Sequence, residues 1–157
     1  MKPELQGLYH QSYEHDACGV GFIVDINGRK SHQMIKDAIT ILKNLEHRGA
    51  VGGDQKTGDG AGMTTQIPHK YFSRVLDFSL PAAGEYGVGC LFLPKQKKNL
   101  EKARLIVEKT ISSENGRLLG WREVPVNPDC LGEVAQKSCP SIWQIFVTFS
   151  QLRGRDL

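Results

Sequence analysis

The feature that most constrains this chain is an alternating apolar segment that begins directly after a cysteine. Cys18 follows a polar stretch, residues 1–17, and precedes four apolar side chains at every second position. These side chains are Val20, Phe22, Val24 and Ile26. A period of two is typical of a β-strand with one buried face. The pattern therefore predicts a strand over residues 19–26 that holds Cys18 at its start.

Cys18 is a candidate nucleophile. If the chain is cut between Ala17 and Cys18, the new terminus carries a thiol and an α-amine on one residue. That amine has an ordinary pKa of about 7.7–8.0, so near neutral pH it can accept the proton of a nucleophile. Gly19 and Gly21 lack a Cβ and would let a ligand or another backbone approach the thiol. The alternative is that Cys18 is a small buried apolar residue, the commoner case for an isolated cysteine.

Motifs further along the chain carry a resemblance to a known family. The ordered set is Cys18-Gly19-Val20-Gly21-Phe22, His47-Arg48-Gly49-Ala50, Thr57-Gly58-Asp59-Gly60-Ala61-Gly62, Leu119-Gly120-Trp121-Arg122, Val124-Pro125-Val126, Leu131-Gly132-Glu133-Val134-Ala135 and Gln144-Ile145-Phe146-Val147. Together these motifs resemble the start of the class II glutamine amidotransferase domain of the glutamate synthase large subunit. The resemblance runs from about residue 14 to Val147.

The resemblance implies an α+β fold of the N-terminal nucleophile hydrolase type, an αββα four-layer sandwich that is incomplete here. It implies a leader at residues 1–17 and the N-terminal part of the amidotransferase domain at residues 18–157. Cys18 would attack the side-chain amide of glutamine, release ammonia and leave a thioester that water hydrolyses to glutamate. Arg48, in the His-Arg-Gly motif, would bind the α-carboxylate of glutamine through its planar guanidinium. From position alone, Arg48 is also explained as a cation at a helix C-terminus.

The resemblance also implies partners and cofactors. Glutamine is the expected substrate, and the remaining glutamate synthase domains or a small subunit are the expected protein partners. No cofactor is expected in this chain, because FMN and an iron–sulfur cluster belong to downstream parts of the family's longer proteins.

Two departures from the family pattern leave other functions open. The family's oxyanion donors include a downstream asparagine–glycine pair, but Asn27-Gly28 and Asn115-Gly116 do not match its context and are expected to form turns. The tail after Val147 departs from the family pattern, which suggests a truncated or frame-shifted copy. A catalytically inert fragment or interaction module is therefore the alternative function. Another amide hydrolase or transferase of the same fold is a third.

Composition excludes several other classes of protein. The chain has 157 residues, 39% of them apolar, and a net charge of +3 from scattered residues, so neither nucleic acid nor a membrane is an expected partner. No segment reaches about 18 consecutive apolar residues, and residues 1–17 lack the apolar core of a secretory signal. The four cysteines are widely spaced without a C-x-x-C pair, so neither a metal site nor a disulfide framework is expected. The expected location is the cytoplasm.

Local patterns predict the remaining elements. Ser31 is a candidate N-cap for a helix that ends near Arg48, with Gly49 just beyond it. Six glycines within residues 49–62 predict a close-packed active-site loop, in which Asp59 stands where a phosphate-binding loop needs lysine. Strands are predicted near residues 63–67, 86–93, 118–126 and 142–149, and helices after Pro68, over 97–113 and near 131–137. Cys90 is expected in the core.

Overall fold

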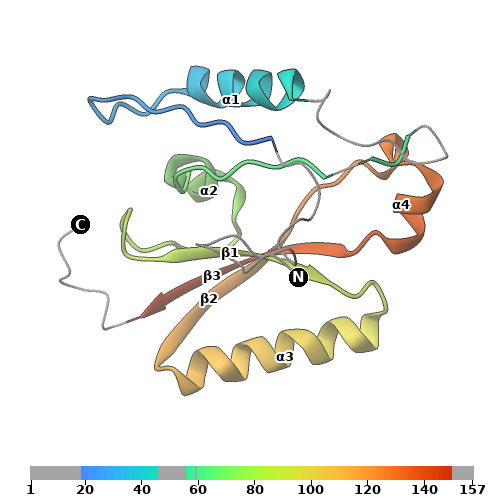
Figure 1. Cartoon of the computed structure of the whole chain (residues 1–157). Helices are drawn as coiled ribbons and strands as arrows, with labels where there is room; N and C mark the ends of the chain where they lie inside the picture. Colours follow the sequence, from blue (N-terminus) through green and yellow to red (C-terminus); the bar gives the residue numbers. More distant parts are fainter. Residues whose placement is uncertain (1–18, 46–55, 59, 150–157) are drawn as a thin grey trace, which may run out of the picture. The chain divides into compact units, whose positions relative to one another are not determined.

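The computed structural model describes residues 19–45, 56–58 and 60–149. The chain divides into two compact units, residues 1–63 and 64–157. The first unit contains one described helix, and the second contains a small sheet with helices on both of its faces (Figure 1).

In the first unit, α1 (His32–Asn44) begins at the predicted cap. The Oγ of Ser31 accepts a hydrogen bond from the backbone N–H of Gln33 at 3.1 Å, which satisfies one of the free amides of the first turn. The helix ends at Asn44 with Leu45 as its C-cap, earlier than the predicted end near Arg48. The Leu45 N–H faces the carbonyls of residues 41–43, so the last turn tightens and stops there. Gly49 lies outside the described residues.

The segment after Cys18 does not form the predicted strand. Its alternating apolar side chains are exposed: Val20 is 87% exposed, Phe22 89%, Val24 70% and Ile26 97%. The opposite row, which includes Gly19 and Gly21, lies against α1 instead, and the blue segment runs alongside that helix in Figure 1. The prediction of a strand with Val20 and Phe22 buried is therefore wrong for this structure. A strand needs a partner for its backbone, and the described residues show neither a partner strand nor a layer over the apolar row.

The second unit is built on a three-stranded antiparallel sheet. The strands are β1 (Gly87–Leu93), β2 (Gly116–Glu123) and β3 (Ser141–Phe149), and their spatial order is β1-β3-β2. β3, the last strand in the chain, is therefore the central one. An irregularity between Leu118 and Gly120 in β2 shifts the pairing with β3.

One face of the sheet packs against α2 (His69–Val75). Phe72 of α2 meets Phe146 of β3 edge to face, with ring centroids 4.9 Å apart, and Tyr86 completes this core. Phe78 lies directly over Gly120, where a Cβ would collide with its ring. The glycine therefore lets an aromatic side chain rest on the backbone of β2.

The other face packs against α3 (Lys97–Ser113). The guanidinium of Arg104 lies over the rings of Trp121 and Trp143, 4.7 and 4.8 Å from their centroids. The Trp121 Nε1–H donates to the Oε1 of Glu108 at 2.8 Å. Figure 1 shows α2 and α3 on opposite sides of the sheet, in agreement with these contacts.

Between β2 and β3 the chain forms two short helices, η3 (Pro128–Cys130) and α4 (Glu133–Ser138). The predicted helix over 97–113 matches α3, and the turn at Asn115 is confirmed by its positive φ of 58°. The strand predicted near residues 63–67 is absent, because those residues have no ladder partner and are exposed. Cys90 is exposed rather than in the core. Phe92, on the same face of β1, is 68% exposed, so the core around Phe72 does not extend to this end of the strand.

The structure therefore mixes helices with an antiparallel sheet, which agrees with the α+β class. Within the described residues, no helix is long and apolar enough to cross a membrane.

Candidate functional site

The two site residues predicted from the sequence, Cys18 and Arg48, both lie outside the described residues. So do residues 46–55 and Asp59, which include much of the glycine-rich loop. The site is therefore built from what the structure describes on either side of them. That is the segment after Cys18, the helix before Arg48 and the end of the loop.

The segment that follows Cys18 lies flush on α1. A Cβ built on Gly21 would stand 2.5 Å from the Cγ2 of Ile41, and one on Gly19 would stand 3.0 Å from the Cδ2 of Leu45. Carbon atoms in contact normally lie about 3.5–4.0 Å apart, so neither glycine leaves spare room on this side. The space that the sequence suggested for a ligand or another backbone is occupied by side chains of α1.

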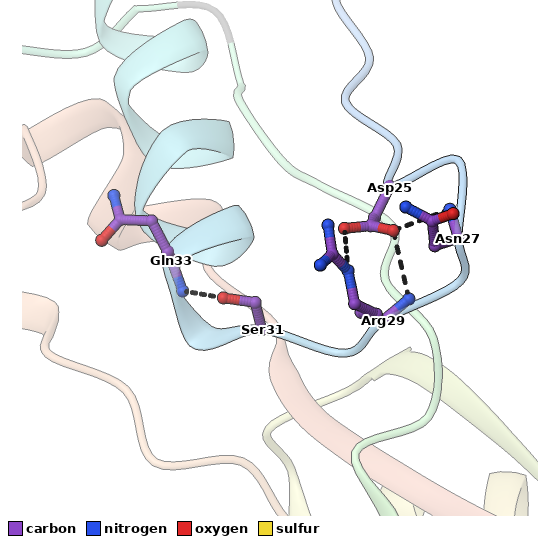
Figure 2. Close-up of polar contacts among 5 residues, drawn as sticks. All are labelled: Asp25, Asn27, Arg29, Ser31 and Gln33. Carbon is purple, nitrogen blue, oxygen red and sulfur yellow. Dashed lines mark hydrogen bonds and ion pairs between the residues drawn. The ribbon is translucent and has the colours of Figure 1, made fainter.

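A tight turn connects this segment to α1, and Figure 2 shows its polar contacts. The Oδ1 of Asp25 accepts from the backbone N–H groups of Asn27 at 2.8 Å and Arg29 at 3.3 Å, and its Oδ2 meets the Arg29 Nε at 3.1 Å. The Gly28 N–H donates to the Asp25 carbonyl at 2.9 Å, with a φ of 67° that favours glycine. The predicted Asn27-Gly28 turn is confirmed. Three short contacts to one carboxylate fix the path from the segment into the helix.

The glycine-rich loop is open at its last two glycines, Gly60 and Gly62. Gly58, Gly60 and Gly62 are exposed, and nothing lies within 4 Å of a Cβ built on Gly60 or Gly62. The prediction of a close-packed loop is wrong for this part. Close packing requires neighbours that the described residues do not bring to it.

The second unit holds two polar clusters that local sequence patterns did not reveal. The hydroxyl of buried Tyr86 hydrogen-bonds the Nδ1 of His69 at 3.0 Å, and burial raises the pKa of the Tyr86 phenol above its ordinary value. Arg122 donates to the Oε1 of Gln144 at 2.9 Å and to the hydroxyl of Tyr71 at 3.1 Å. The signal for the second cluster is the pairing of Arg122 with Gln144 across two strands. That pairing depends on sheet register and is invisible in a local pattern.

A shallow hollow of about 270 Å³ lies beside the two short helices. It is lined by Lys95, Pro128, Asp129, Leu131, Gln136 and Cys139. The Gln136 Nε2–H donors are engaged by the carbonyls of Pro128 and Leu131, which stabilises the wall. Among the residues that the structure describes, no group of three histidine, cysteine or acidic side chains could hold a metal ion.

Comparison with known proteins gives a consistent result. The model of the class II glutamine amidotransferase family matches residues 18–157. The match continues to residue 157, which corrects the expectation that the likeness ends at Val147. A tail of ten residues contains too few motif positions to judge a likeness from motifs alone.

Relatives from distant organisms agree with the family match. The chain is 41% identical over 146 residues to the glutamate synthase (NADPH) large chain of Bacillus subtilis, which covers 92% of this chain and 10% of that protein. It is 45% identical over 150 residues to the glutamate synthase (NADH) of Saccharomyces cerevisiae, which covers 90% of this chain and 7% of that protein. The ferredoxin-dependent glutamate synthase 1 of Arabidopsis thaliana is 36% identical over 159 residues, covering 99% of this chain and 10% of that protein.

The chain thus spans about a tenth of the length of these relatives or less. Within that tenth the family match covers every residue from Cys18 onward. The chain belongs to the class II glutamine amidotransferases.

Proposed function

We propose that this chain is the N-terminal part of the glutaminase domain of a glutamate synthase large chain, and that Cys18 is its nucleophile. The observation that carries the proposal is the start of the family match at residue 18. The match begins with the cysteine itself and leaves out residues 1–17. This supports a leader at residues 1–17, an amidotransferase region at residues 18–157 and a cut before Cys18.

The proposed chemistry balances without any cofactor in this chain. The Cys18 thiol gives its proton to its own α-amine, and the sulfur attacks the side-chain amide carbon of glutamine. The C–N bond then breaks, ammonia leaves and a thioester remains. Water hydrolyses the thioester to glutamate and restores the thiol. Arg48 holds the α-carboxylate of glutamine with two parallel N–H donors.

The first unit describes the chain next to each of these two residues in the sequence. Cys18 is bonded directly to Gly19, which lies against Leu45 at the end of α1. Arg48 follows Leu45 by three residues. The residue after Cys18 thus contacts the end of α1, and Arg48 follows that end in the sequence.

Backbone amides of the two asparagine–glycine pairs form hydrogen bonds within their own turns. The N–H groups of Asn27 and Gly28 are engaged by the Asp25 side chain and carbonyl, and the N–H of Asn115 by the Ser112 carbonyl. These three backbone amides are therefore not available as oxyanion donors. Because catalysis of this type depends on such donors, an inert fragment or interaction module is the alternative function.

The proposal includes the wider assembly. The two stacked sheets of the αββα sandwich would be completed by further chain of the kind that the longer relatives possess. FMN and an iron–sulfur cluster would be held by other glutamate synthase domains, which would use the ammonia. Those domains or a small subunit would be the partners, in the cytoplasm.

The test is glutaminase activity of the full 157-residue chain and its variants. Mass spectrometry should first find the mature chain starting at Cys18. Ammonia release from glutamine should then disappear in Cys18→Ala, because the nucleophile is lost, and persist in Cys90→Ala, which removes an exposed thiol of the sheet. Arg48→Lys should raise KM more than it lowers kcat, since lysine keeps the charge but loses the paired donors.

Three results would reject parts of the proposal. Activity that survives in Cys18→Ala would reject Cys18 as nucleophile, and an active chain that still begins at Met1 would reject the α-amine as base. A folded, correctly cut chain that releases no ammonia would favour the inert fragment.

A further inference from the structure

We infer that helix α1 positions the nucleophile, and that Gly21 and Ile41 are the positioning residues through which it does so. The inference rests on the proposed function of Cys18. It assigns a role to a helix that carries neither proposed site residue.

The geometry begins with the contact between Gly21 and Ile41. The Cγ2 methyl of Ile41 occupies the position next to Gly21 where any other residue would place its Cβ, at 2.5 Å. Ordinary contact needs about 1 Å more, so a side chain at position 21 would push the segment off the helix by about that distance. Cys18 is three residues away along the same segment.

A second contact with α1 lies closer to the cysteine in the sequence. Gly19, the residue bonded to Cys18, lies against Leu45, and a Cβ there would be 3.0 Å from its Cδ2. Ile41 and Leu45 are four residues apart, so they lie one above the other on one face of α1. Gly19 and Gly21, two residues apart on the segment, thus contact Leu45 and Ile41, one turn apart on the helix. These two contacts fix the position of the segment along the helix axis.

The helix itself is held at its N-terminal end. Ser31 caps its first turn, and the Asp25 carboxylate fixes the turn that leads into it (Figure 2). A displacement of about 1 Å at a reacting group can lower a rate about 100-fold. Holding the segment in a fixed position on α1 should therefore have a large effect on the reaction rate at Cys18. The competing explanation is that the two glycines serve stability alone, without any effect on Cys18.

The experiment adds a methyl group at position 21 and then removes the Cγ2 methyl of Ile41, which that group would contact. Gly21→Ala introduces the Cβ, while Ile41→Leu has the same volume but lacks the β-branched Cγ2 methyl. Leucine is also a better helix former than isoleucine, so α1 should persist. Gly87→Ala is the matched control, because its new Cβ would be 3.8 Å from the nearest atom, Val147 Cγ2.

The readout is the rate at which Cys18 of the cut, full-length chain is alkylated by an electrophilic ketone analogue of glutamine, divided by its rate with iodoacetamide. Gly21→Ala should lower this ratio about 100-fold, and Gly21→Ala/Ile41→Leu should recover at least about tenfold of the loss. Gly87→Ala should leave the ratio unchanged. Ile41→Leu alone should lower it by less than Gly21→Ala does, because it loosens the contact without forcing the segment away from the helix. Amide exchange of α1 verifies that each variant is folded.

The outcomes separate this inference from the proposed function. If the unmodified chain shows no preference for the glutamine analogue, the proposed function fails and the inference fails with it. If it shows the preference but Gly21→Ala keeps it, or loses only stability, the inference alone is overturned. If Gly21→Ala unfolds α1, Ile41→Ala tests the same contact from the helix side. An unchanged ratio in Ile41→Ala would also overturn the inference.

Discussion

At the scale of single residues, Tyr86 shows how burial sets a chemical property. The residue is 6% exposed and packs in the core with Phe72 and Phe146, while its hydroxyl hydrogen-bonds the Nδ1 of His69. Burial disfavours the charged phenolate and raises the pKa of Tyr86 above its ordinary value of 10.0. A group with a raised folded-state pKa contributes stability below its unfolded pKa and loses that contribution as the pH rises through the folded value.

We therefore expect a pH-dependent effect of Tyr86→Phe. At neutral pH the substitution should cost about 1 kcal/mol, because it removes the hydrogen bond to His69. Above about pH 10 the unmodified protein should lose stability faster than the variant, so the two curves should converge. Urea unfolding followed by tryptophan fluorescence between neutral and alkaline pH measures this difference. Parallel curves would contradict the burial of the phenol.

At the scale of elements, α3 is attached to the sheet through one arginine between two indoles. Arg104 lies over both Trp121 and Trp143, and Glu108 accepts from the indole N–H of Trp121. The remaining apolar side chains on the inner face of α3 are only partly buried. The polar and cation–π contacts are therefore a substantial part of the attachment.

We expect Arg104→Ala to destabilise the second unit by about 1–3 kcal/mol, because two cation–π contacts are lost together. Arg104→Lys should cost less, because the charge remains although the planar stacking surface is lost. Lys102→Ala, on the exposed face of the same helix, should stay within about 0.5 kcal/mol. Urea unfolding is read from the two tryptophans, which both lie at this contact. Equal losses for Arg104→Ala and Lys102→Ala would contradict the assigned role.

At the scale of the whole molecule, the apolar row after Cys18 stands out. Four alternating side chains are more exposed than is usual for residues of their kind, in a chain that spans about a tenth of the length of its relatives or less. Exposed apolar area of this size contributes little to the free energy of unfolding and much to the binding of apolar dyes.

Phe22→Ser tests this exposure. With 89% of the side chain exposed, its loss should change the free energy of unfolding by less than about 0.5 kcal/mol and should lower the binding of an apolar fluorescent dye. Phe72→Ala, in the buried core, should cost about 3–5 kcal/mol. Unfolding followed by far-UV circular dichroism gives both values. A large loss for Phe22→Ser would mean that the row is buried in solution.

Features that depend on a few neighbouring residues could be predicted from the amino-acid sequence. The Ser31 cap, the Asn27-Gly28 turn and the bounds of α3 follow from side-chain hydrogen bonds, positive φ angles and helical periodicity. The family also followed from the order of the motifs. The roles of Cys18 and Arg48 stay predictions, since both residues lie outside the described structure.

Which face of an element meets which neighbour became known only from the packing of the folded chain. The alternation of residues 19–26 fits burial of either row, and the contact with α1 selected the glycine row because Ile41 and Leu45 fit where a Cβ is missing. Likewise, the exposure of Cys90 and the pairing of Arg122 with Gln144 depend on strand order and register. A local pattern specifies how side chains alternate, but burial is decided by partners distant in the sequence.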